Sequence, residues 1–162
     1  HQILSWTLRH ETIPGTFAWA EQVNPTNGSF SGGDMPHAWA AASYVTLVRE
    51  MLLSERGDTL ELLSGAPDWW LADGRIIDLQ DAYTHFGPLN LRTESELIQT
   101  EAGWNGKLIL TLSGAAPPAG FRWKLPVNPS ALSGPMGSKT EAGWLIVPPE
   151  AGVVKLTFTA SH

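Results

Sequence analysis

The chain has 162 residues, a formal net charge of −6 and a hydrophobic fraction of 43%, which is enough for a packed core. The negative charge argues against a nucleic-acid partner, which requires a basic face. No apolar run approaches the roughly 20 residues that a membrane span needs, and the absence of cysteine excludes disulfides and thiolate chemistry. Eight residues are tryptophan, a side chain that fills protein cores and also stacks on the apolar faces of sugar rings.

The opening third of the chain predicts a short helical hairpin. On a helix over residues 2–11, the spacing of Ile3, Leu4 and Leu8 places all three side chains on one face. Residues 24–33 are rich in Asn, Pro, Gly and Ser, and this composition predicts a loop before the next helix.

A second helix is expected to follow that loop. Asp34 is a suitable N-cap residue, Pro36 is tolerated in the first turn, and Gly57 ends the helix. Apolar residues recur every three or four positions and form one stripe along this helix, which consists of Ala38, Ala41, Val45, Val48 and Leu52. Such a stripe requires a surface that covers it.

Beyond the second helix the chain has the pattern of strands and turns. Seven segments with strand character are separated by turns that contain Pro or Gly, namely 59–65, 75–83, 89–103, 107–114, 121–127, 143–149 and 153–160. Short strands at such regular spacing predict an antiparallel β-sandwich. We therefore expect a mainly β fold, with a helical segment in residues 1–56 and a β-sandwich domain in residues 57–162.

A five-residue sequence, Thr-Glu-Ala-Gly-Trp, occurs at residues 100–104 and again at 140–144. A true repeat extends beyond five residues, so we interpret the two copies as similar turns that lead into strands. The alternative interpretation is that Trp104 and Trp144 are equivalent residues on one sheet and together form a binding platform.

The segment from residue 15 to residue 55 resembles the last hairpin of the (α/α) six-hairpin barrel of glycoside hydrolases of the α-L-rhamnosidase type. The resemblance depends on a tryptophan two residues before a glutamate (Trp19 and Glu21), a loop, and a helix that opens with His37 after a Gly-rich turn. In that family the barrel runs directly into a C-terminal β-sandwich. The similarity spans roughly residues 13–112, where LELLSGAPDWWL and RIIDLQDAYTHFGPLNLRTES resemble the first strands of that sandwich.

The resemblance implies that Glu21 is the catalytic base of an inverting hydrolysis or lies in the sugar pocket. It also implies that Trp19 packs against the substrate or holds Glu21, and that His37 and Trp39 line the same substrate-binding end of the barrel. An inverting enzyme also needs a general acid about 6.5–9.5 Å from the base, and the family keeps this acid upstream of the residues present here. The resemblance therefore implies either a C-terminal fragment that is catalytically incomplete alone, or the product of a truncated gene that has another role. Roles without a function in catalysis or binding stay open for two of these residues. Glu21 is then an exposed carboxylate at the edge of a loop, and His37 is a local hydrogen-bond partner.

The expected partner is an oligosaccharide or polysaccharide, with no cofactor, metal, nucleic acid or membrane. The remainder of a parent barrel, or a second copy of the chain, is expected to cover the apolar helix stripe. The cellular compartment stays open, with a bacterial-type secreted or periplasmic location favoured.

Two other classes of function remain open. The first is a carbohydrate-binding module with an exposed aromatic platform, for which the candidate residues are Trp69, Trp70, Trp104, Trp123 and Trp144. The second is a copper oxygenase in which the amine and imidazole of His1 bind the metal together with His10, His37 or His85. A serine hydrolase is disfavoured because the sequence has no Gly-x-Ser-x-Gly motif.

Overall fold

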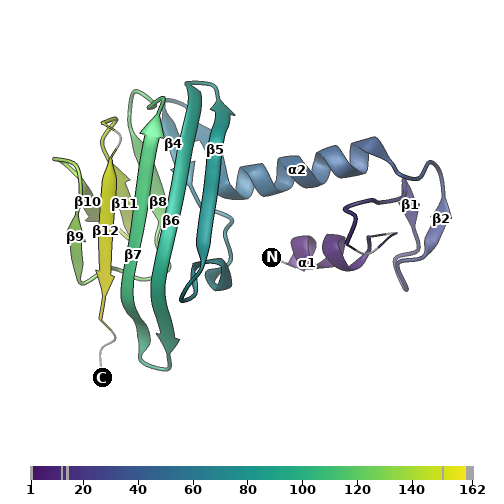
Figure 1. The fold of residues 1–162 in the computed structure, drawn as a ribbon, viewed down its shortest axis with the longest axis horizontal. Coiled ribbons are helices and arrows are strands. Elements are labelled where there is room, and N and C mark those ends of the chain that lie inside the picture. The colour runs from purple at the N-terminus through teal and green to yellow at the C-terminus, as the bar shows by residue number, and fades with distance from the viewer. Residues whose placement is uncertain (1, 12, 14, 151, 160–162) are drawn as a thin grey trace. The chain divides into compact units, whose positions relative to one another are not determined.

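The computed structural model describes residues 2–11, 13, 15–150 and 152–159. The chain divides into two compact units, residues 1–51 and residues 52–162, which are described separately (Figure 1). No helix in the described part of the chain has the length and apolar character that crossing a membrane requires.

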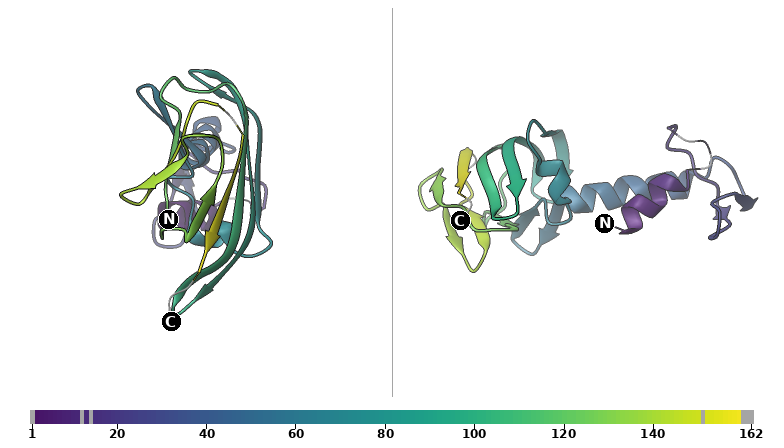
Figure 2. Two further views of the ribbon diagram at one scale, coloured as in Figure 1. Left: turned by 90° about the vertical axis from the view of Figure 1, so that its left-hand side faces the viewer. Right: turned by 90° about the horizontal axis from the view of Figure 1, so that it is seen from below.

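The larger unit is a β-sandwich of two five-stranded sheets, as the sequence predicts. The short sheet has the order β10-β11-β8-β4-β3, and its strands are β3 (Leu53–Arg56), β4 (Thr59–Leu62), β8 (Phe121–Lys124), β10 (Lys139–Glu141) and β11 (Trp144–Val147). The long sheet has the order β5-β6-β7-β12-β9, and its strands are β5 (Ile76–Thr84), β6 (Gly87–Thr100), β7 (Gly103–Gly114), β9 (Ala131–Ser133) and β12 (Val153–Phe158). Figure 2 shows the two sheets as separate layers, with the strands of the long sheet curved along their length. Within the described residues of the sandwich, the strand pairs are antiparallel except β4 with β8, which run parallel.

The core of the sandwich lies between the inner faces of the two sheets. Strand β6 shows the pattern that produces it, because alternate residues are buried while Glu94 and Glu96 between them are exposed. The largest buried side chains come from both sheets and include Phe121, Trp123, Leu108 and Phe158. Burial of each such side chain stabilises the fold by about 1.5–3 kcal/mol.

The smaller unit contains two helices, α1 (Gln2–Arg9) and α2 (Ala38–Leu52), and a two-stranded hairpin of β1 (Gln22–Val23) and β2 (Phe30–Gly32). Its central side chain is Trp19. The indole Nε1–H donates a hydrogen bond to the carbonyl of Thr7 at 2.9 Å, and the ring centroid lies 4.9 Å from that of Tyr44. Trp19 therefore connects helix α1 with helix α2.

Both ends of the second helix differ from the prediction. Asp34 is not its N-cap, because residues 34–37 pair with the segment around Trp19 and Glu21, and α2 begins only at Ala38. The helix ends at Leu52 rather than at Gly57. Residues 53–56 form strand β3 instead, and Gly57, with a φ of 58°, lies in the tight turn between β3 and β4.

The loop expected at residues 24–33 is in fact the tip and second strand of the β1–β2 hairpin. The first helix ends at Arg9, and its three apolar residues do not share one buried face, since Leu4 is buried whereas Ile3 and Leu8 are exposed. On α2, Val45 of the apolar stripe is also exposed.

Candidate functional site

Glu21 lies on the surface of the smaller unit, in a backbone arrangement that fixes its position. The Glu21 N–H donates to the carbonyl of Asp34 at 3.0 Å, and the Asp34 N–H donates to Glu21 Oε2 at 3.3 Å. Gly33 lies directly against this side chain, where a Cβ atom would collide with it, and has a φ of 78°. Glycine is the residue that accepts both conditions.

The other three residues predicted to line a sugar site in this unit have different environments. Trp19 is only 5% exposed, so it is a core residue rather than an open sugar contact. His37 is half-buried, and its backbone N–H donates a hydrogen bond to the backbone carbonyl of Trp19 at 2.8 Å. Trp39 is 79% exposed, with 6.2 Å between its ring centroid and that of His37. The structure therefore places Glu21 and His37 on either side of one backbone pairing, with Trp39 on the surface.

Two of the candidate platform tryptophans in the sandwich are buried, and a third is only partly exposed. Trp104 is 7% exposed and packs edge-on against Phe158, and Trp123 is fully buried. The ring of Trp144 is covered by two cations, with the Arg122 guanidinium 4.8 Å and the Lys124 amine 5.4 Å from its centroid.

Trp104 and Trp144 are also not equivalent positions. Trp104 lies on β7 of the long sheet and Trp144 on β11 of the short sheet. A platform formed by both residues on one sheet is therefore wrong, whereas the interpretation of their shared sequence as two turns agrees with the β6–β7 and β10–β11 hairpins.

Trp69 and Trp70 are different, because they lie at the surface on a single 3₁₀ turn, η1 (Asp68–Leu71). Trp69 is 61% exposed and Trp70 is half-buried, and their rings meet edge to face with 5.6 Å between centroids. A groove of about 310 Å³ runs beside them and is lined by Leu52, Trp69, Trp70, Arg75, Ile76 and Ile77. Of the candidate tryptophans in the sandwich, this pair presents the most exposed indole.

A buried serine holds this turn in place. The hydroxyl of Ser95, on the inner face of β6, donates a 2.5 Å hydrogen bond to the carbonyl of Leu71, whose side chain is also buried. The Ser95 backbone then pairs with the chain that returns from η1, through Gly74 at 2.8 Å and Arg75 at 3.1 Å. Both tryptophans are therefore attached to the sheet by hydrogen bonds on the C-terminal side of the turn.

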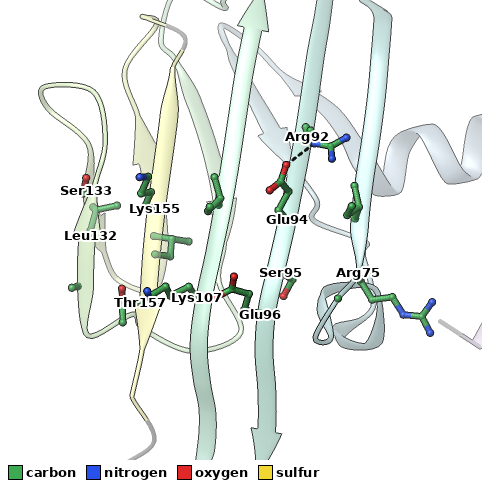
Figure 3. Close-up of a pocket in the computed structure, with 15 residues that line it drawn as sticks. Arg75, Arg92, Glu94, Ser95, Glu96, Lys107, Leu132, Ser133, Lys155 and Thr157 are labelled. Atoms are coloured by element: carbon green, nitrogen blue, oxygen red, sulfur yellow. Dashed lines mark hydrogen bonds and ion pairs between the residues drawn. The ribbon is translucent and has the colours of Figure 1, made fainter.

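A second depression, of about 630 Å³, lies over the long sheet (Figure 3). The strand register defines its rows of residues: one row crosses all five strands as Ile76, Glu94, Ile109, Lys155 and Ser133, and the next contains Glu96, Lys107, Thr157 and Ala131. Arg75 and Ile76 line both this depression and the tryptophan groove. The two hollows are therefore neighbours on one surface.

The charges in this depression fall into two groups. Arg92 binds Asp78 at 2.7 Å and Glu94 at 2.8 Å, and the hydrogen bonds to Glu94 and then to Asp78 raise the pKa of its guanidinium. In the part of the chain that the structure describes, Lys107 and Lys155 form no ion pair. Arg75, the fourth cation that lines the depression, also forms no ion pair among the described residues, so one cation is neutralised and three are not.

The sequence contains a signal for this depression that the interpretation above did not use. Charged and hydroxyl residues alternate with buried residues along β6, β7 and β12, which places them on one outer face. Which of these residues lie opposite one another depends on the strand register, and a single sequence does not give it.

The copper-oxygenase interpretation finds no support. His1 lies outside the described residues, and the described residues contain no group of three or more His, Cys, Asp or Glu side chains that could hold a metal. His10 instead stacks on Trp6 with 4.2 Å between ring centroids, and its Nδ1 lies 2.7 Å from the Trp6 carbonyl.

Comparison of the chain with protein-family models, with curated proteins and with solved structures finds no match.

Proposed function

We propose that the protein binds carbohydrate and that its β-sandwich carries the binding site, at Trp69 and the adjoining depression on the long sheet. The observation that carries this proposal is the exposed indole of Trp69, held on a turn that is hydrogen bonded to Ser95. The groove beside it continues into a surface of charged and hydroxyl side chains.

This combination suits a sugar chain. A sugar ring offers an apolar face of C–H groups, which packs on an indole, and a rim of hydroxyls, which needs hydrogen-bond donors and acceptors. The indole is already oriented by Trp70 and by the anchored turn, so binding orders few additional bonds. Because the surface is shallow and has one main aromatic anchor, we expect dissociation constants on the order of micromolar to millimolar.

Isothermal titration calorimetry tests this proposal. The protein is titrated with a panel of neutral and acidic oligosaccharides, and the dissociation constant of each is measured. Trp69→Ala is expected to reduce affinity at least about tenfold, a loss of about 1.4 kcal/mol. Tyr83→Ala is the matched control, because Tyr83 is an exposed aromatic residue on β5 of the long sheet and lies outside both hollows. Unchanged binding by Trp69→Ala, or no binding of any oligosaccharide by the unaltered protein, contradicts the proposal.

A second candidate function is that of the C-terminal region of a glycoside hydrolase, with Glu21 as the catalytic base. The observation that favours it is the backbone pairing that presents the Glu21 carboxylate at the surface, on the same unit as His37 and Trp39. In this proposal the upstream part of the enzyme supplies the general acid and covers the exposed residues of the α2 stripe, such as Val45.

Hydrolysis of aryl glycosides by the protein expressed from its natural gene tests this candidate. If Glu21 is the base, Glu21→Gln lowers kcat by about 10²–10⁴ and leaves folding nearly unchanged, because the amide oxygen can still accept the Asp34 N–H. Full hydrolysis by Glu21→Gln rules the role out. Trp39→Ala, which keeps the carboxylate, then separates a contribution to substrate binding from one to catalysis.

A further inference from the structure

Two lysines on the outer face of the long sheet occupy neighbouring positions at one corner of the depression. Lys107 on β7 lies directly opposite Thr157 on β12. Lys155 is also on β12, two residues before Thr157, and lies opposite Ser133 on β9. Directly opposed residues have Cβ atoms about 4.5–5.5 Å apart, and diagonal neighbours lie within about 7–8 Å. Two lysines and two hydroxyl residues are therefore neighbours on one area of the sheet.

Neither amine is neutralised by the carboxylates of the same face. Glu96 lies opposite Lys107 in the register, yet the two side chains form no ion pair. Figure 3 shows the Lys107 side chain extended toward Thr157, on the side away from Glu96. Glu94 is bound to Arg92 instead. In a protein with a net charge of −6, two neighbouring lysines without a counter-ion form a local positive site.

We propose that this corner, formed by Lys107, Lys155, Ser133 and Thr157, binds the anionic group of an acidic saccharide. The inference rests on the proposed carbohydrate-binding function and specifies the class of ligand. Ammonium groups are compact point charges with rotatable donors, which suits the oxygens of a carboxylate or a sulfate ester. The two hydroxyls donate further hydrogen bonds to the same anionic oxygens.

The tryptophan groove then binds another part of the same ligand. The depression and the groove share Arg75 and Ile76 at strand β5, whereas the lysine corner lies at β12. Three strand spacings separate β5 from β12, a distance of about 14 Å. One sugar ring does not span this distance, but a short oligosaccharide does, so both contacts are made only by a chain of sugars.

Calorimetric titration with three oligosaccharides of equal length tests the inference, one neutral, one of uronic acids and one bearing sulfate esters. We expect at least one acidic oligosaccharide to bind at least tenfold more tightly than the neutral one, with an affinity that falls as salt is added. The acidic ligand that binds identifies the anionic group. The double variant Lys107→Ala/Lys155→Ala is expected to abolish this preference, so that the acidic and neutral chains bind with the same affinity.

Lys139→Ala is the matched control, because Lys139 is an exposed lysine of the short sheet that already pairs with Glu141 at 2.6 Å. Both lysines of the corner point away from the core, so the double variant should unfold at the same temperature as the unaltered protein. Equal binding of neutral and acidic chains that depends on Trp69 overturns this inference and keeps the proposed function. Absence of binding to all three oligosaccharides overturns both.

Discussion

The indole of Trp69 stands at 90° to the indole of Trp70, with 5.6 Å between the two ring centroids. Edge-to-face packing of this kind is a favoured aromatic arrangement and stabilises the pair by about 0.5–1.5 kcal/mol beyond the burial of area. Trp70 is half-buried, so the contact orients Trp69 without covering it. An exposed aromatic ring in a fixed orientation is the feature from which the proposed function follows.

Removal of the hydroxyl of Ser95 should loosen the turn that carries these rings. Ser95→Ala leaves the Leu71 carbonyl without its side-chain donor, so we expect the free energy of unfolding to fall by about 1–2 kcal/mol. Affinity for oligosaccharide should also fall, although Ser95 is buried beneath the turn. Ser113→Ala, at an exposed position of the same sheet, should change the stability by less than about 0.5 kcal/mol. Urea unfolding measures the stability, and calorimetry measures the affinity. If Ser95→Ala is as stable as the unaltered protein, the Ser95 hydroxyl does not anchor the turn.

The ion pair of Glu61 with Arg122 should matter more for stability than the ion pairs of Arg92. The Glu61 side chain is only 11% exposed, and Arg122→Ala leaves it with Ser64 and the more distant Arg56, at 3.7 Å. We expect a loss of about 2–4 kcal/mol, since a buried carboxylate loses its main partner. Arg92→Ala removes two exposed ion pairs and should cost about 0–1 kcal/mol. Urea unfolding measures both variants. If the free energy of unfolding falls equally in the two, burial of Glu61 does not make its ion pair the more important one.

Gly106 and Gly103 provide a matched pair for the close approach of β6 and β7. Both have φ values near +120°, but a Cβ at Gly106 would collide with the carbonyl of Glu96, whereas nothing lies within 4 Å of one at Gly103. Backbone strain alone costs about 1–3 kcal/mol in either alanine variant. Gly106→Ala should therefore unfold at a lower temperature than Gly103→Ala. Equal melting temperatures would show that the strands separate there without cost.

The pKa of Tyr44 provides a test of the smaller unit. Burial, and then the nearby Glu11 carboxylate, raise it above the ordinary value of 10.0. Because the folded pKa is higher than the unfolded one, this contribution to stability is complete below about pH 10 and is lost as the pH rises through the folded pKa. Absorbance titration of Tyr83→Phe, in which Tyr44 is the sole tyrosine, should give a midpoint above 10. A midpoint at or below 10 means that Tyr44 is not packed as described.

The sequence predicts the sandwich because alternation of buried and exposed residues is a local property of each strand. It does not predict β9 and β10, which have three residues each and carry too few side chains to show an alternation. The exposure of each tryptophan could not be predicted either. Whether Trp69 is exposed and Trp104 is buried depends on the face that each residue occupies, which is set by strand pairing over long distances in the sequence.

Chemical-shift mapping of the indole N–H groups tests the binding site most directly, because the eight tryptophans are distributed over both units of the chain. On titration with a bound oligosaccharide, the signals of Trp69 and Trp70 should shift, while those of the buried Trp104 and Trp123 stay in place. Each indole N–H signal is assigned by its absence from the spectrum of a variant in which that one tryptophan is replaced. Shifts confined to Trp39, or no shift at Trp69 under conditions in which calorimetry detects binding, would contradict a site on the sandwich.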